Sequence, residues 1–133
     1  MILDDPAFCE ALERKLRGRA PFSCSILVDR SNYLQRTSRH QRPVLRQLQG
    51  LGADVRLCSG LDASSVFGAG AYPGIHHIKA IVLDNRIAFS GGSNITRASR
   101  FNRELAFRFT GPIVKDILQE VLNAKATGVA ELS

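Results

Sequence analysis

The side chains best suited to chemistry lie in one stretch, where His77, Lys79 and Asn94 supply an imidazole, an ammonium and a carboxamide. These three groups suit attack on a phosphodiester. An imidazole nitrogen can attack phosphorus, and its neutral form is well populated near neutral pH. Lysine and asparagine can donate hydrogen bonds to the non-bridging oxygens, where charge is held in the transition state. Because these side chains supply the positive charge, we expect neither a metal ion nor a cofactor.

Two apolar runs, residues 75–83 and 86–90, flank Asp84 and Asn85 and predict a β-hairpin. Both of these residue types tolerate positive φ, so we expect a two-residue turn between the strands. In such a turn the last residue of the first run pairs with the first residue of the second, and this pairing sets the register of the hairpin.

That register gathers the reactive side chains at one end of the hairpin. Alternate strand residues share a face, so His77 and Lys79 point the same way. Lys79 lies opposite Ser90 in this register. His77 lies opposite Gly92, and Asn94 follows just past the end of the pair. Gly92 and the glycine before it leave the facing backbone free of side chains, which would let a substrate approach.

The spacing His-x-Lys, four residues, Asp, six residues, Gly-Gly-x-Asn resembles the HKD motif of the phospholipase D superfamily. The family pattern usually ends in Gly-Ser-x-Asn, and Gly92 stands at the serine position here. The Gly-Gly form is similar to the first motif of bacterial members of the cardiolipin-synthase type. Residues 102–112 are similar to the strand and the Gly-Pro helix start that follow that motif.

The resemblance implies a role for each motif residue. His77 is the expected nucleophile, which forms a phosphohistidine, and Asp84 completes the catalytic set, although an aspartate in a turn is often structural. Glu104 stands where the family often has an acid that orients a histidine, and an exposed strand residue is the equal alternative. His76 points to the opposite face and is expected to support the site or to lie at the surface. The groups expected to hold the phosphate are Lys79, Gly92, Ser93 and Asn94.

Members of this superfamily use two histidines. One attacks phosphorus, and the other protonates the leaving oxygen and then activates water or an alcohol. The sequence carries one such motif. The second histidine is therefore expected from a second copy of the chain in a homodimer, or from the other half of a longer two-motif protein.

The resemblance implies a phosphodiesterase or phosphatidyltransferase that acts on phospholipid headgroups. One alternative is a single-motif endonuclease that cleaves nucleic acid as a homodimer. Another is a non-catalytic half that binds phosphate or a partner. Water as the acceptor makes the enzyme a hydrolase and an alcohol makes it a transferase, and the sequence leaves both open.

The charge of the chain favours anionic partners. Its 133 residues carry a net charge of +6, from 18 Lys and Arg against 12 Asp and Glu. Phospholipid headgroups and nucleic acid both fit this excess, although many small domains are basic for solubility alone. Aromatic residues make up only 7% of the chain, with no Trp, so a platform for stacking bases is poorly supported. With no membrane-spanning stretch and no signal peptide, the predicted location is the cytoplasm or the membrane surface.

The elements around the motif predict an α/β fold. We expect one domain over residues 1–133, a layered sandwich in which helices flank a mixed β-sheet. Asp5 and Pro6 are typical of a helix start, and Gly18 of a helix end. The three cysteines are expected to be buried thiols. The expected elements outside the hairpin are helices over 6–17 and 43–49, strands over 22–29, 53–58 and 104–110, and a terminal helix that buries Ile113, Ile117, Leu118 and Val121.

Overall fold

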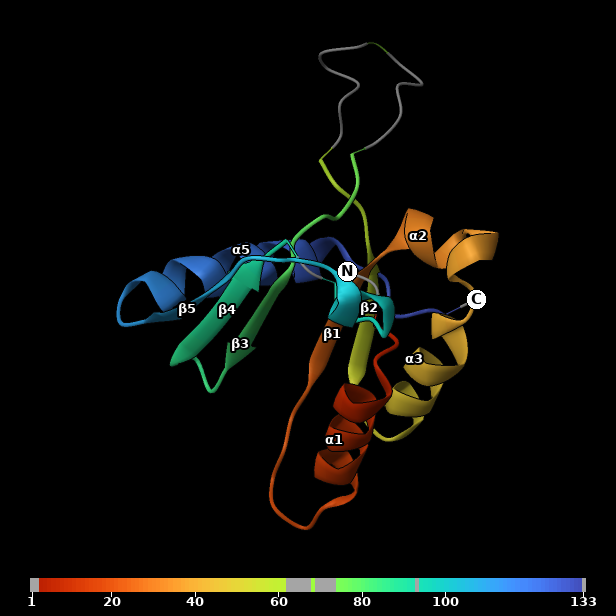
Figure 1. Cartoon of the computed structure of the whole chain (residues 1–133), viewed down its shortest axis with the longest axis horizontal. Helices are drawn as coiled ribbons and strands as arrows, with labels where there is room; N and C mark the ends of the chain where they lie inside the picture. The colour runs from red at the N-terminus through yellow and green to blue at the C-terminus, as the bar shows by residue number, and fades with distance from the viewer. Residues whose placement is uncertain (1–2, 62–67, 69–73, 93, 133) are drawn as a thin grey trace.

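The structure is a computed structural model that describes residues 3–61, 68, 74–92 and 94–132. Helices and strands alternate in the first part of the chain, and a hairpin, a further strand and a long helix follow (Figure 1). In chain order the elements are α1 (Pro6–Arg17), β1 (Ser25–Asp29), α2 (Arg30–Leu34), η1 (Arg36–Ser38), α3 (Gln41–Gly50), β2 (Asp54–Cys58), β3 (Ala80–Leu83), β4 (Ile87–Gly91), η2 (Ala98–Phe101), β5 (Ala106–Thr110) and α5 (Ile113–Thr127).

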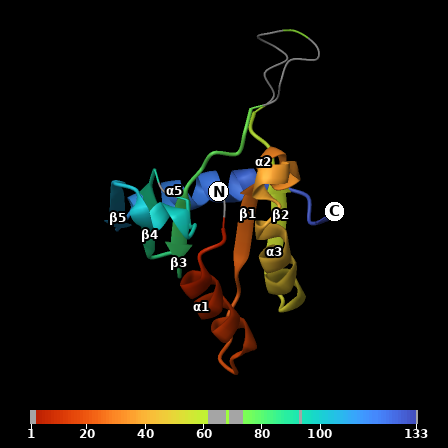
Figure 2. The same ribbon diagram turned by 45° about the vertical axis from the view of Figure 1, so that its right-hand side comes forward.

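The hydrophobic core lies around the parallel strands β1 and β2. Alternate residues of these strands share a face, and α1 and α3 lie beside the pair (Figures 1 and 2). Cys9 belongs to this core, and burial raises the pKa of its thiol to about 11. Cys58 is also buried, whereas Cys24 is half-buried. The other buried core residues are Leu3, Ile26, Val28, Tyr33, Leu45, Leu48, Ala53, Val55 and Leu57.

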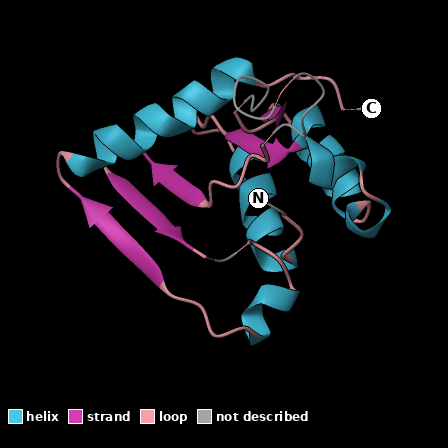
Figure 3. Ribbon diagram, turned by 90° about the horizontal axis from the view of Figure 1, so that it is seen from above, coloured by secondary structure: helices cyan, strands magenta, loops and turns pink. Residues whose placement is uncertain are grey.

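The second sheet is antiparallel, with the strand order β3-β4-β5. The helix α5 runs along one face of this sheet (Figure 3). Ala88 of β4 is fully buried, whereas its neighbour Phe89 is 37% exposed. Because neighbouring strand residues point to opposite faces, the helix covers the Ala88 face and the Phe89 face stays open.

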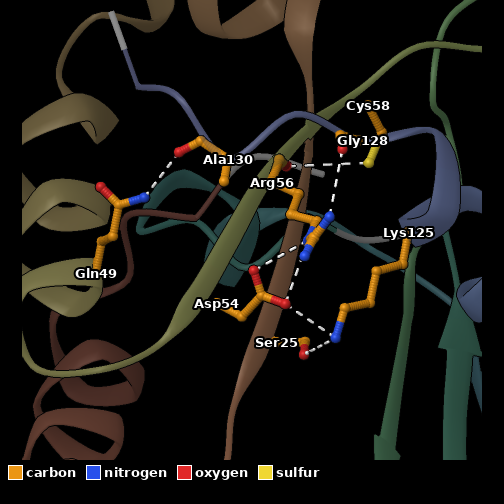
Figure 4. Close-up of polar contacts among 8 residues, drawn as sticks. All are labelled: Ser25, Gln49, Asp54, Arg56, Cys58, Lys125, Gly128 and Ala130. Atoms are coloured by element: carbon orange, nitrogen blue, oxygen red, sulfur yellow. Dashed lines mark hydrogen bonds and ion pairs between the residues drawn. The ribbon is translucent and has the colours of Figure 1, made fainter.

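The end of α5 is joined to the parallel strands by polar contacts (Figure 4). Lys125 Nζ lies 2.9 Å from Asp54 Oδ2 and donates to Ser25 Oγ at 2.9 Å. Arg56 Nε donates to Asp54 Oδ1 at 3.0 Å. The Lys125 contact, with Arg56 adding to it, holds the pKa of Asp54 below its ordinary value. One helix therefore packs on the antiparallel sheet and is fastened to the parallel one.

The predicted α/β class is confirmed, with both parallel and antiparallel strands flanked by helices. Within the described residues the two kinds of strand form separate ladders rather than one continuous mixed sheet. Asp5 caps α1 as predicted, because its Oδ1 accepts from Phe8 N at 3.0 Å. The first strand begins at Ser25, later than predicted, and none of the helices in the described ranges has the length and apolar character needed to cross a membrane.

The apolar stripe of α5 differs from the prediction at its first residue. Ile113 is 47% exposed, whereas Val114 is 1% exposed. Val114, and not Ile113, stands at the i, i+3, i+4, i+7 spacing with the half-buried Ile117, Leu118 and Val121. The stripe that faces the sheet therefore begins at Val114.

Candidate active site

The hairpin that carries the motif turns where the sequence predicted. Asp84 and Asn85 have φ of 52° and 54°, and Arg86 N donates to Leu83 O at 3.0 Å. The register, however, differs by one residue from the prediction. Leu83 pairs with Ile87, so Arg86 stays in the turn instead of opening the second strand.

The observed register follows from which side chains share a face. It places Val82 opposite Ala88, the fully buried residue on the helix-covered face. A slip of one residue would put different β3 side chains on that face. Lys79 consequently lies beside Gly91 and not opposite Ser90 as predicted: Gly91 N donates to Lys79 O at 3.4 Å, and Ser90 Oγ donates to the same oxygen at 3.2 Å.

His77 and Lys79 lie just before β3, which begins at Ala80, so the prediction that both stand on the strand is wrong. Their side chains nevertheless meet. Lys79 Nζ lies 2.9 Å from His77 Nε2 and 3.4 Å from Nδ1. An ammonium group only donates, so the ring nitrogen that it meets is one without a proton. His77 is exposed to solvent, and the lone pair that would make this nitrogen a nucleophile is engaged by Lys79 in this structure.

The sequence predicted Asn94 beside His77, and in the structure Asn94 shares a hollow with Lys79. Both residues line one surface hollow, together with Ser90 of β4. His77 is outside the set of described residues that line this hollow, and it reaches the group through its contact with Lys79. Asn94 also lines a neighbouring hollow, where Arg100 lies.

The paired glycines differ in what surrounds them. A Cβ on Gly91 would lie 2.5 Å from Leu105 O and 2.8 Å from the Cα of Ala106. A Cβ on Gly92 would lie 3.0 Å from Glu104 Oε2. The missing side chain of Gly91 thus lets the start of β5 approach β4, while Gly92 faces only the movable end of the exposed Glu104 side chain, and its predicted contact with phosphate stays a prediction.

Glu104 is exposed, and its Oε1 accepts from Asn102 Nδ2 at 3.4 Å. Its hydrogen bond therefore runs to the adjacent loop and not to His77. The predicted histidine-orienting role of Glu104 stays a prediction.

Comparisons with known proteins bear on the family and the fold of the chain. The family model described as cardiolipin synthase, PLD-like domain matches residues 1–128. The chain belongs to the phospholipase D superfamily. Among solved structures it resembles the phospholipase D family member Nuc from Salmonella typhimurium, with a TM-score of 0.73 and 20% identity over 99% of this chain and 78% of that one. It also resembles NucT from Helicobacter pylori, with a TM-score of 0.53 and 17% identity over 95% of this chain and 94% of that one. No curated protein matches the chain.

Membership of the phospholipase D superfamily makes the chain a relative of phosphodiesterases. One motif residue is not brought to the site that the hairpin forms. Asp84 lies in the turn, at the opposite end of β3 from Lys79, about 16 Å away for five residue steps along a strand. Ser93 lies outside the described residues.

Asp29, which lies near the motif, was not identified from the sequence. Asp29, at the end of β1, is 1% exposed and accepts a hydrogen bond from His76 N at 2.6 Å. His76 itself is buried, and burial lowers the pKa of its imidazole. An acid directly after the apolar run Ile26–Val28 is a visible signal, but its partner lies far along the chain.

Proposed function

We propose that this chain is a phosphodiesterase or phosphatidyltransferase of the phospholipase D type, which acts on phospholipid through a phosphohistidine at His77. The 2.9 Å contact between Lys79 Nζ and His77 Nε2 carries the proposal, because it sets beside the nucleophile a cation that can turn to a phosphate oxygen, which frees the nitrogen lone pair for attack. Asn94 supports it, since this residue lines the same hollow as Lys79. Attack on phosphorus needs this combination of a nucleophile with donors for the phosphate oxygens.

The reaction proceeds in two halves. An unprotonated ring nitrogen of His77 attacks phosphorus, and the bond from phosphorus to the leaving oxygen breaks. Lys79 and Asn94 donate to the non-bridging oxygens while an acid protonates the leaving oxygen. Water or an alcohol then attacks the phosphohistidine and gives its proton to the conjugate base of that acid, and His77 is released unchanged.

The acid comes from a second motif, and we place it on His77 of a second copy of the chain. A two-fold axis between two copies of the chain would bring both histidines to one phosphate. The other half of a longer two-motif protein is the alternative source. Mixing wild-type and His77→Ala chains distinguishes a shared site, because activity then falls as the square of the wild-type fraction. A fall in simple proportion to that fraction contradicts the shared site.

Phospholipid is the favoured substrate, supported by the description of the matching family and by the net charge of +6. Such a substrate brings the protein into peripheral contact with a membrane. Nucleic acid is the second candidate, because the exposed Arg97 and Arg103 follow Asn94 and are suited to backbone phosphates.

The deciding experiment offers the purified chain phosphatidylglycerol vesicles, single-stranded DNA and bis(4-nitrophenyl) phosphate. We expect turnover of the vesicles and of the dye ester, unchanged by EDTA. Cleavage of DNA without turnover of lipid would transfer the assignment to the nuclease candidate. Loss of activity in EDTA with rescue by a divalent ion would contradict metal independence, and no turnover of any substrate would favour the non-catalytic half.

A matched pair of lysine variants tests the site itself. We expect Lys79→Ala to lower kcat by about 10²-fold or more, because a donor to the transition-state charge is lost. Lys115→Ala is the control, because Lys115 is exposed and lies at the start of α5, away from the site. The strand before it ends at Thr110, which pairs with Ile87 at the turn end of the hairpin, opposite the end that carries Lys79. Equal losses in both variants would contradict the assignment.

A further inference from the structure

The segment that carries His77 and Lys79 is not paired with another strand in a β-sheet. Residues 74–79 belong to no helix or strand, although they hold both His77 and Lys79. The conformation of such a segment depends on contacts made at its two ends. The contacts at each end come from a different sheet.

The downstream end is held by the antiparallel sheet. Lys79 O accepts from Gly91 N at 3.4 Å and from Ser90 Oγ at 3.2 Å, and both donors belong to β4. These bonds set the position of the Lys79 backbone.

The upstream end is held by residues that follow or end the parallel strands. Gly60 N donates to Gly74 O at 2.6 Å, and Gly74 N donates to Leu61 O at 3.1 Å. Two residues further on, His76 N donates to Asp29 Oδ2 at 2.6 Å. The Asp29 bond is therefore the contact from the parallel sheet nearest in sequence to His77.

The two carboxylate oxygens of Asp29 accept hydrogen bonds from different parts of the chain. Its Oδ1 accepts from Asn32 N at 2.9 Å, and this bond caps α2. The same oxygen also accepts from the Ser31 hydroxyl. Asp29 Oδ2 accepts from His76 N. Burial raises the pKa of Asp29, but these three hydrogen bonds outweigh it and hold the pKa below its ordinary value. The group is thus a buried carboxylate with both oxygens occupied, and a bond from an amide to an ionised acceptor is stronger than a neutral one.

We propose that Asp29 is a positioning residue for the reaction: through the His76 amide it holds the segment that presents His77 to Lys79. The expected loss of kcat rests on the proposed function, whereas the expected loss of the His77–Lys79 contact rests on geometry alone. Asp29 acts through the backbone and does not touch the substrate. A small displacement of a nucleophile costs on the order of 10²-fold in rate, so loss of this bond is expected to lower kcat and to leave KM nearly unchanged.

Asp29→Asn and Ser31→Ala form the matched test. The amide oxygen of Asn can still cap α2, but its NH₂ group would face the His76 N–H, and two donors repel. Ser31→Ala removes a bond to the other oxygen and leaves the His76 contact in place. We expect kcat to fall about 30- to 100-fold in Asp29→Asn and less than about threefold in Ser31→Ala. Equal kcat values in the two variants would overturn the proposal.

An NMR measurement separates this proposal from the proposed function. The nuclear Overhauser effect between the His77 ring and the Lys79 side chain is expected in the wild type and in Ser31→Ala, and is expected to be lost in Asp29→Asn. Its persistence at full intensity in Asp29→Asn overturns the positioning role, whether or not the protein turns over any phosphodiester. An inactive wild type with the expected changes in the Overhauser effect would instead refute the proposed function alone.

A second variant removes the same bond from the donor side. His76→Pro deletes the amide proton and leaves Asp29 bonded to Ser31 and Asn32. It is expected to reproduce the loss of the His77–Lys79 contact if Asp29→Asn does not fold. Failure of both variants to fold, while Ser31→Ala folds, would make Asp29 a structural residue only and overturn the proposal.

Discussion

The two sheets of this protein differ sharply in how deeply they are buried. In the parallel pair, Val28 and Val55 are fully buried, and so are Leu45 and Leu48 of α3, which packs beside it. In the antiparallel sheet, Leu83 is 47% exposed. Phe89 and Phe107 there are also exposed. Apolar burial stabilises a fold roughly in proportion to the area removed from water, so stability is concentrated around the parallel strands.

The candidate chemistry lies in the less buried region. His77 and Lys79 stand where the chain passes from one sheet to the other, and Asn94 follows β4. An exposed, thinly covered sheet can present a reactive side chain to a large substrate, while the buried half keeps the fold intact. The comparison predicts that changes to the exposed side chains near the hairpin alter activity more than stability, and that changes to the buried apolar side chains of the parallel half do the reverse.

The largest expected effect is on activity. His77→Ala is expected to lower kcat by at least about 10³-fold, because the nucleophile is lost, and to change the free energy of unfolding by less than about 0.5 kcal/mol, because the side chain is exposed. Turnover and denaturant unfolding measured on the same preparation check both statements. Recovery of a covalent phosphoprotein intermediate from the variant would remove His77 from the nucleophile's role.

A pair of leucines compares the stability of the two regions with the same chemical change. Leu48→Ala in α3 is expected to lower the free energy of unfolding by about 2–5 kcal/mol, because it opens a cavity in the core. Leu83→Ala in β3 is expected to cost less than about 1 kcal/mol, since half of this side chain already contacts water. Urea unfolding of both variants gives the two values. Similar losses would break the comparison.

The neighbouring glycines test close packing within the hairpin sheet. Gly91→Ala is expected to cost about 1–3 kcal/mol, because the new Cβ meets the backbone of β5. Gly92→Ala meets only the end of the Glu104 side chain, which can move, and is expected to cost less than about 0.5 kcal/mol. Thermal unfolding ranks the two variants. The reverse order would mean that β5 is less tightly joined to β4 than the structure indicates.

The smallest expected effect is the pH dependence of the polar contacts at the parallel strands. The pKa of Asp54 is lower in the folded chain than in the unfolded one, first because of its contact with Lys125. Its contribution is therefore present above the unfolded pKa and is lost as the pH falls through the folded pKa. We expect Asp54→Asn to unfold at lower urea than the wild type at pH 6, with the difference vanishing in acid. A difference that stays constant with pH would remove the charge of Asp54 as the cause.

Local signals in the sequence predicted local structure well. The Asp5 cap and the Asp84-Asn85 turn each depend on hydrogen bonds or dihedral angles within a few residues, and the structure has both. The predicted register of the hairpin was wrong by one residue, because the register depends on which side chains α5 covers. The prediction that Ile113 rather than Val114 begins the buried stripe of α5 was wrong for the same reason, because packing against the sheet decides which helix residues are buried.

The sequence by itself determined the family and the candidate chemistry, because residue types at fixed spacing record which groups a site uses. The family match bears out the resemblance, while the roles of His77, Lys79, Asn94 and Glu104 and the single domain over residues 1–133 stay predictions.

Only the tertiary structure decided how the reactive segment is held. The motif does not reveal that residues 74–79 lie outside any strand or that Asp29 fastens them. Asp29 and His76 are 47 positions apart. A contact over such a separation forms because two sheets pack together, and no local pattern encodes it.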